Sequence, residues 1–313
     1  MSQLPSLLRG LRDLRRKHDT RLATVTGDQM ELPTSFTYET MMTQRPGKMA
    51  GADVRWMFLR RIDHLEEHTI QIEDHLQNRF GITKTQAQRY LAANEVARGD
   101  LYAALMGLTD DDLDVEPVDP PGEWSLRTIL AHMVNVERSY MENCLWAVEK
   151  FRNGEPFSPM PRGETPDYRD ATLADFARML DDARMESNAR LAGLSDADLR
   201  APTVWMNMNC DVRFRLMRFA MHEREHTAHI RKWRVQTGKP FSEAARLQGM
   251  AWQAGGRLDA ALVGVPDDVL ERDPGDGEWP VRRIIEHIGS AERYFQRVIK
   301  SALAEAEQEL ATA

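Results

Sequence analysis

Apolar residues recur with helical spacing along most of the chain, and glycines and prolines divide this pattern into segments. A period near 3.6 residues predicts amphipathic helices. No segment shows the sustained alternation of apolar and polar residues that indicates a strand. Residues 19–52 and 153–169 contain several glycines and prolines and are expected to be loops. The pattern therefore predicts an all-α fold. Helices are expected at residues 5–18, 53–80, 85–108, 124–151, 171–193, 211–237, 242–265 and 278–310.

Capping residues set several of these boundaries. Gly81 and Gly238 stand where helices are expected to end, because glycine readily adopts the left-handed conformation that follows a last helical turn. Thr85, with Gln88 three residues later, predicts a capping box. Ser242 predicts the N-cap of a later helix.

One predicted helix, residues 211–237, carries His222, His226 and His229 on a single stripe. Positions i, i+4 and i+7 of a helix lie nearly above one another, so their ring nitrogens can converge on one point. Neutral imidazole is a common ligand of Zn²⁺ and Ni²⁺. The alternative is that these are ordinary surface or hydrogen-bonded core histidines. A metal site would need a further ligand from another helix.

The chain contains an internal repeat. The segment DVRWMFLRRIDHLEEHTIQIEDH aligns without a gap on DVRFRLMRFAMHEREHTAHIRKW, 158 residues later. This shift places His64 on His222 and His68 on His226. Each half of the chain therefore has a pair of histidines at i and i+4.

A second pair of segments supplies the further ligand. GEWSLRTILAHMVNVERSY and GEWPVRRIIEHIGSAERYF pair His132 with His287 and Trp124 with Trp279. Both histidines stand among apolar residues, where a buried polar ring needs a partner. A carboxylate would satisfy that need, but the repetition of all three histidines favours a three-histidine metal site in each half. The two tryptophans are expected in the core.

Four glutamates stand at fixed spacing from these histidines. Glu225 and Glu67 immediately precede the second histidine of each i, i+4 pair, and they are the candidate catalytic residues. Glu137 and Glu292 follow His132 and His287, respectively, by five residues. All four are candidates for bases or for hydrogen-bond partners of the ligands. The alternative is that they are solvated or paired with arginine.

At these motifs the chain resembles the DinB-like family of metal-dependent proteins. GEWSLRTILAHMVNVERSY is similar to the Trp…His segment of the family's second helix, and HEREHTAHI is similar to the H-x3-H segment of its fourth. The resemblance covers residues 85–237 well and the outer segments in pieces. It implies an up-down-down-up four-helix bundle with a divalent metal. Carried over, the ligands are His132, His222 and His226. His229 falls where the family tolerates glutamine and is left out.

The chain departs from the family in the order of its parts, which reads as helices 3-4, then 1-2-3-4, then 1-2. Each half could close on itself. Alternatively, residues 83–238 form one contiguous bundle, and residues 1–82 and 239–313 together form a split bundle. In the implied bundle, the end of helix 4 and the start of helix 1 lie ~35 Å apart, whereas the short linkers reach only about 14 Å. The second arrangement is therefore favoured.

That arrangement gives the metal sets His132/His222/His226 and His64/His68/His287. Residues 5–18 do not align visibly with residues 171–193, so their place as helix 3 rests on order alone. Two chains that exchange ends would satisfy the same distances, which leaves a homodimer open.

Three neutral imidazoles leave a divalent ion with open positions, the pattern of a catalytic site. Zn²⁺ or Ni²⁺ is expected. Such an ion activates water or a bound thiol. The resemblance implies a low-molecular-weight thiol and an S-transferase, and a hydrolase is the related possibility for water. The competing interpretation is a non-catalytic scaffold stapled by metal, or a protein that responds to metal or stress.

Composition narrows the classes of binding partner and the cellular locations that are expected for the chain. The 313 residues are 42% hydrophobic and 29% charged, with a net charge of −8. An acidic balance argues against nucleic acid or anionic membranes as partners, so a small molecule is expected. No apolar run is long enough to cross a membrane. Two cysteines, Cys144 and Cys210, form no disulfide framework, so a cytoplasmic location is expected.

Overall fold

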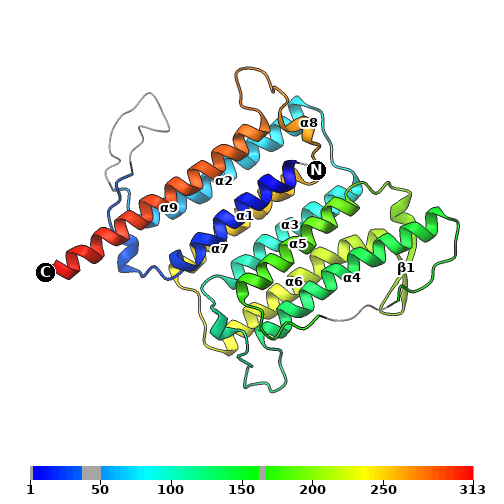
Figure 1. The fold of residues 1–313 in the computed structure, drawn as a ribbon, viewed down its shortest axis with the longest axis horizontal. Coiled ribbons are helices and arrows are strands. Elements are labelled where there is room, and N and C mark those ends of the chain that lie inside the picture. Colours follow the sequence, from blue (N-terminus) through cyan, green and yellow to red (C-terminus); the bar gives the residue numbers. More distant parts are fainter. Residues whose placement is uncertain (1–2, 37–50, 162–165, 313) are drawn as a thin grey trace.

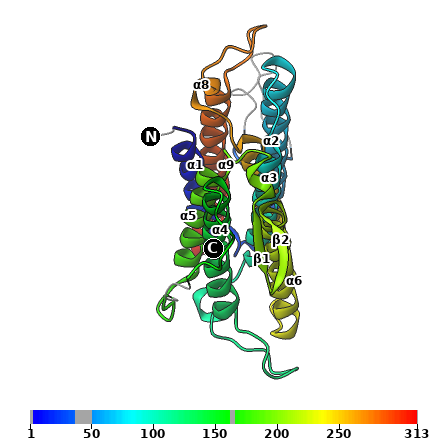
Figure 2. The same cartoon turned by 90° about the vertical axis from the view of Figure 1, so that its right-hand side faces the viewer.

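The computed structural model describes residues 3–36, 51–161 and 166–312. Its long helices lie side by side in two layers, as Figure 1 and the perpendicular view in Figure 2 show. One layer contains α9, α1, α5 and α4, and the other contains α2, α7, α3 and α6. Of the described helices, none combines the length and apolar character needed to cross a bilayer. The helices are α1 (Gln3–Leu22), α2 (Val54–Asp74), α3 (Gln86–Leu105), α4 (Leu126–Arg152), α5 (Leu173–Leu191), α6 (Val212–Gln236), α7 (Glu243–Leu262), α8 (Asp267–Leu270) and α9 (Val281–Thr312).

The all-α prediction is confirmed, with one addition that the sequence pattern missed. Strands β1 (Pro202–Trp205) and β2 (Met208–Asp211) form a small antiparallel hairpin before α6. The turn residues Met206 and Asn207 have φ angles of 46° and 64°. Four-residue strands are too short to show an alternating pattern, and the left-handed turn joins them in only two residues.

The predicted caps are confirmed. Thr85 accepts from the backbone N–H of Gln88 at the start of α3, and the Gln88 side chain completes the capping box. The Ser242 hydroxyl accepts from the backbone at the start of α7. Gly238 adopts a φ angle of +67° two residues beyond α6. Gly81 adopts a φ angle of +65° two residues beyond the π-helical turn His75–Arg79, which continues α2. Four residues separate each of these glycines from the first residue of the next helix, which is Gln86 of α3 or Glu243 of α7.

The expected loop at residues 19–52 differs from the structure at its start. Helix α1 continues to Leu22, and a 3-10 turn occupies Asp28–Glu31. Residues 37–50 of this loop lie outside the described residues.

The helices form two groups of four. Helices α3, α4, α5 and α6 surround two clusters of buried apolar side chains, one including Leu216 and the other including Leu130 and Phe176. Helices α1, α2, α7 and α9 surround another, including Leu65 and Ile288. The second group draws its helices from both ends of the same chain, and α2 packs against both α7 and α9. No exchange with a second chain is needed to close it.

Helix α1 has in its group the place that α5 has in the other, and the sequences of the two helices do match. A shift of 169 residues, rather than 158, places Leu11 on Leu180 and Arg15 on Arg184. All four side chains are buried. The match is invisible at the 158-residue shift because the connection after α1 is longer than the connection after α5.

The two groups meet where α3 crosses α7, at a pair of glycines in equivalent repeat positions. A Cβ atom added to Gly256 would lie 2.8 Å from the backbone oxygen of Glu95 and 3.0 Å from the Cα of Gly99. Equally, a Cβ on Gly99 would lie 2.8 Å from the Trp252 oxygen. Only glycine lets the two backbones approach so closely.

Gly256→Ala is therefore expected to lower the free energy of unfolding by about 1–3 kcal/mol, because the added methyl overpacks a backbone contact. Denaturant unfolding of the full chain measures it. Gly10→Ala is the control: a Cβ at Gly10, in α1, has nothing within 4 Å, so this change is expected to stabilise by about 0.4–1 kcal/mol. Equal effects of the two changes would show that the α3–α7 approach is not tight.

A buried arginine joins four helices at this junction. The Arg12 guanidinium, on α1, donates to Asp259 of α7 at 2.9 Å and to Glu95 of α3 at 3.0 Å. It also lies 3.6 Å from the Asp181 carboxylate of α5. Arg12 is 2% exposed. Because buried charges are tolerated only when paired, this cluster fixes how the two groups lie against each other.

Candidate metal centres

Site A consists of His132, His222 and His226. His132 comes from α4, and the other two come from successive turns of α6. The Nε2 atom of His222 lies 3.0 Å from that of His132 and 3.1 Å from that of His226. Asp211 is the N-cap of α6, and its carboxylate accepts from the Phe214 N–H at 2.9 Å. Asp211 is also the first residue of the repeated segment that carries the two histidines.

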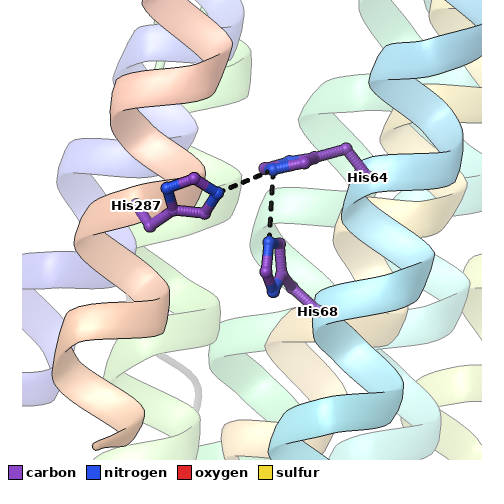
Figure 3. Close-up of side chains that lie close together, drawn as sticks. All are labelled: His64, His68 and His287. Atoms are coloured by element: carbon purple, nitrogen blue, oxygen red, sulfur yellow. Dashed lines mark hydrogen bonds between the residues drawn. The ribbon is translucent and has the colours of Figure 1, made fainter. Parts of the chain in front are cut away.

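Site B consists of His64, His68 and His287, and Figure 3 shows the three rings turned toward one another. His64 and His68 lie on α2, and His287 lies on α9. The Nε2 atom of His64 is 3.0 Å from that of His287 and 3.2 Å from that of His68. The cap has the same form as in site A, since Asp53 accepts from the N–H of Trp56 at 2.7 Å.

The donor set fits a divalent metal in both sites. Within each site, one ligand atom from each residue lies within 4.8 Å of the others. Two nitrogens bound to one Zn²⁺ at about 2.0–2.1 Å in tetrahedral geometry stand about 3.4 Å apart. The observed separations of 3.0–3.2 Å are close to this value. Each site offers three ring nitrogens and no carboxylate, a set of donors that suits Zn²⁺ or Ni²⁺ better than Mg²⁺ or Ca²⁺.

The rings are held neutral, which is the form that binds metal. Burial lowers the pKa of His222 to about 3, helped by the neighbouring His226 and His132. Burial likewise lowers the pKa of His64 to about 3 and that of His226 to about 4. The pKa values of the other three rings are also lowered, mainly by burial.

These shifts predict that the metal-free protein loses stability in mild acid. The unfolded chain, with histidine pKa values near 6.5, binds more protons than the folded chain as the pH falls from 6.5 toward 3–4. The unfolding free energy therefore falls through this window and is unaffected by these rings above it. Urea midpoints at about pH 7.5 and about pH 5 in excess chelator measure the effect. His222→Gln should reduce the dependence; an unchanged slope would contradict the assignment.

Trp124 and Trp279 lie against the rings, and Trp124 is not a core residue. The Trp124 ring is 39% exposed and stacks on His226 with 6.0 Å between centroids and 7° between planes. It also meets His132 edge-on at 5.1 Å. Trp279 repeats the second contact, with its centroid 5.0 Å from that of His287. The expectation of a core position is wrong for Trp124, because this residue precedes Ser125, the N-cap of α4, and so lies outside the periodic helix.

The four glutamates are all paired with arginine. Glu225 accepts two hydrogen bonds from Arg218, at 2.8 and 2.9 Å, and this interaction lowers the pKa of its carboxyl. Glu67 accepts from Arg60 in the same way, at 2.9 Å. Both carboxylates are more than half exposed. A catalytic role for Glu225 or Glu67 stays a prediction.

The other two glutamates are buried among charged side chains. Glu137 accepts from Arg98 and Arg184, and Glu292 accepts from Arg61. Their exposed fractions are 7% and 2%. In these contacts the carboxylates hold helices together within each group.

Sequence reasoning missed two further carboxylates next to the sites. Glu123 lies 3.4 Å from the Nε2 atom of His229, which stands outside the three-histidine set of site A. In site B, Glu278 accepts from the side chain of Gln71 at 2.8 Å. The signal was present, since both glutamates belong to the repeated Gly-Glu-Trp motif that precedes each helix with a single histidine.

The model of the mycothiol-S-transferase family matches residues 90–238. This stretch holds most of α3 and all of α4, α5 and α6, so it includes the three residues of site A. Site B lies outside it. No curated protein and no solved structure matches the chain.

Proposed function

We propose, from the chain's membership of the DinB-like metal-dependent family through residues 90–238, that it is a metal-dependent S-transferase that uses a low-molecular-weight thiol. Mycothiol is the thiol that the matched family suggests. The observation that carries the proposal is the convergence of His132, His222 and His226 within the matched residues.

Site A has the features that such a reaction needs from the protein. Its three rings are neutral donors with lowered pKa values. When bound, a divalent cation supplies Lewis acidity, which lowers the pKa of a thiol or a water molecule. Three protein ligands leave room for a further ligand. Zn²⁺ or Ni²⁺ is the proposed ion.

The surroundings of site A provide contacts for a small molecule. The exposed edge of Trp124 covers one side of the rings. On another side, the Tyr140 ring meets His222 edge-on at 5.7 Å, and its hydroxyl accepts from the Trp205 indole at 3.2 Å. We infer that these aromatic groups orient the thiol and its electrophile and limit the access of water.

Transfer to an electrophile tests the proposal directly. The metal-loaded full chain is incubated with a fluorogenic bimane electrophile and, in separate reactions, mycothiol, cysteine or glutathione. With at least one of these thiols, the conjugate is expected to form faster than in the uncatalysed reaction. A chelator should abolish this activity, and added Zn²⁺ or Ni²⁺ should restore it. Hydrolysis of an ester or amide substrate, with no thiol dependence, would favour the hydrolase instead. No metal-dependent turnover of either kind would leave the non-catalytic scaffold.

A further inference from the structure

The two candidate centres differ in what holds their ligands. In site B, the Nδ1 atom of His68 lies 2.8 Å from the amide oxygen of Gln71. The Gln71 amide nitrogen in turn donates to Glu278 at 2.8 Å. This chain of hydrogen bonds fixes the orientation of the His68 ring and leaves its Nε2 lone pair facing His64. Such outer partners strengthen metal binding by a histidine.

Site A lacks this support. The Nδ1 atom of His226, the counterpart of His68, is buried and has no hydrogen-bond partner among the described residues. The position of Gln71 is taken by His229, whose ring lies 5.9 Å from that of His226 and whose Nε2 atom faces Glu123. Both halves therefore have the carboxylate, Glu278 or Glu123. Only site B has a side chain, Gln71, that links this carboxylate to a histidine of the site.

The walls of the two sites differ in the same direction. His64 is 2% exposed, whereas His68 and His287, like the three rings of site A, are partly exposed. Where site A has the hydroxyl-bearing Tyr140 against His222, site B has Phe295 against His64, with 5.6 Å between the centroids. Around His64, site B is thus more enclosed and less polar than site A is around His222. Site B also joins α2 to α9, which come from opposite ends of the chain.

We propose that the centres divide two tasks. Site B retains its metal tightly and fastens the two ends of the chain together, and site A binds metal more weakly and keeps it accessible to substrate. The Gln71 bridge between His68 and Glu278 is the main cause of the difference. The assignment of catalysis to site A rests on the proposed function, whereas the inequality of the two affinities does not.

The experiment is a competition between the full chain and a chelator at constant pH, with Zn²⁺ as the metal. Protein loaded with Zn²⁺ is dialysed against increasing chelator, and bound zinc per chain is measured by elemental analysis. Two separate losses are expected, each of one ion. Repeating the titration on His132→Ala and His287→Ala assigns the losses, with the easily removed ion absent from the first variant and the tightly held ion absent from the second.

Two variants test the cause. Gln71→Ala should lower the affinity of the tight site about 10–100-fold and leave the weak site unchanged. His229→Gln, which gives site A the arrangement of site B, should raise the affinity of the weak site by about 10-fold or more. Gln77→Ala is the matched control, because Gln77 is an exposed glutamine in the turn that follows α2. This change should alter the affinity of neither site. Circular dichroism at each step verifies that the variants are folded.

The outcomes separate this inference from the proposed function. Loss of both ions in one step, an unchanged titration of Gln71→Ala, or weaker binding in His229→Gln would overturn the inequality, and S-transfer could still occur. Two unequal sites without thiol transfer would overturn the proposed function alone. A chain that binds no zinc would overturn both.

Discussion

His132→Ala is expected to lower thiol-transfer activity by more than about 100-fold and to reduce the metal content from two ions per chain to one. Changes to outer partners of metal ligands cost about 10–100-fold, and loss of a direct ligand should cost more. His132 is the sole residue that α4 gives to site A. Steady-state kinetics and elemental analysis of protein without a histidine tag measure the two effects.

Glu142→Gln is the control for this prediction, because Glu142 is an exposed residue of the same helix that pairs with Arg190. It should keep both ions and full activity. His287→Ala should also reduce the metal content to one ion per chain, since it removes a ring from site B. Two ions in either histidine variant would refute the ligand assignment.

Glu137→Gln is expected to lower the free energy of unfolding by about 3–5 kcal/mol, because it breaks a buried network of charges. Glu137 accepts from Arg184 at 2.8 and 2.9 Å and from Arg98 at 3.2 Å. Both arginines also donate to Glu223. Loss of the Glu137 carboxylate would leave Glu223 as the carboxylate that is hydrogen-bonded to both buried guanidinium groups.

Urea unfolding in the presence of chelator measures this effect without a contribution from metal. The exposed pair of Glu142 and Arg190, with side chains 42% exposed on each side, again supplies the control. Glu142→Gln should change the unfolding free energy by no more than about 0.5 kcal/mol. A loss below about 1 kcal/mol in Glu137→Gln would mean that the network is not important for stability.

Some features could be predicted from the sequence because they depend on neighbouring residues. The helical period, the capping box at Thr85 and the cap at Ser242 all arise from contacts within a few residues. The β-hairpin escaped prediction because its strands are four residues long. The match of α1 to α5 escaped because a longer connection changed the shift between the two halves.

In the candidate sites, too, some features could be predicted from the sequence and others could not. The repeat singled out six histidines, since helical geometry alone sets i and i+4 residues on one face. The roles of the glutamates could not be read in this way. Glu225 stands one residue before His226 and is exposed, whereas Glu137 stands five residues after His132 and is buried against Arg184. Burial depends on which helix packs alongside, and spacing does not encode that.

By itself, then, the sequence determined a helical protein with a duplicated set of histidines, because local periodicity and repetition are properties of the chain. Only the tertiary structure decided that His132 lies beside His222, that Trp124 stacks on the rings in partial contact with solvent, and that Gln71 links His68 to Glu278. These contacts join residues of different helices, and their energies depend on packing and burial. Two nearly identical motifs can therefore have unequal surroundings.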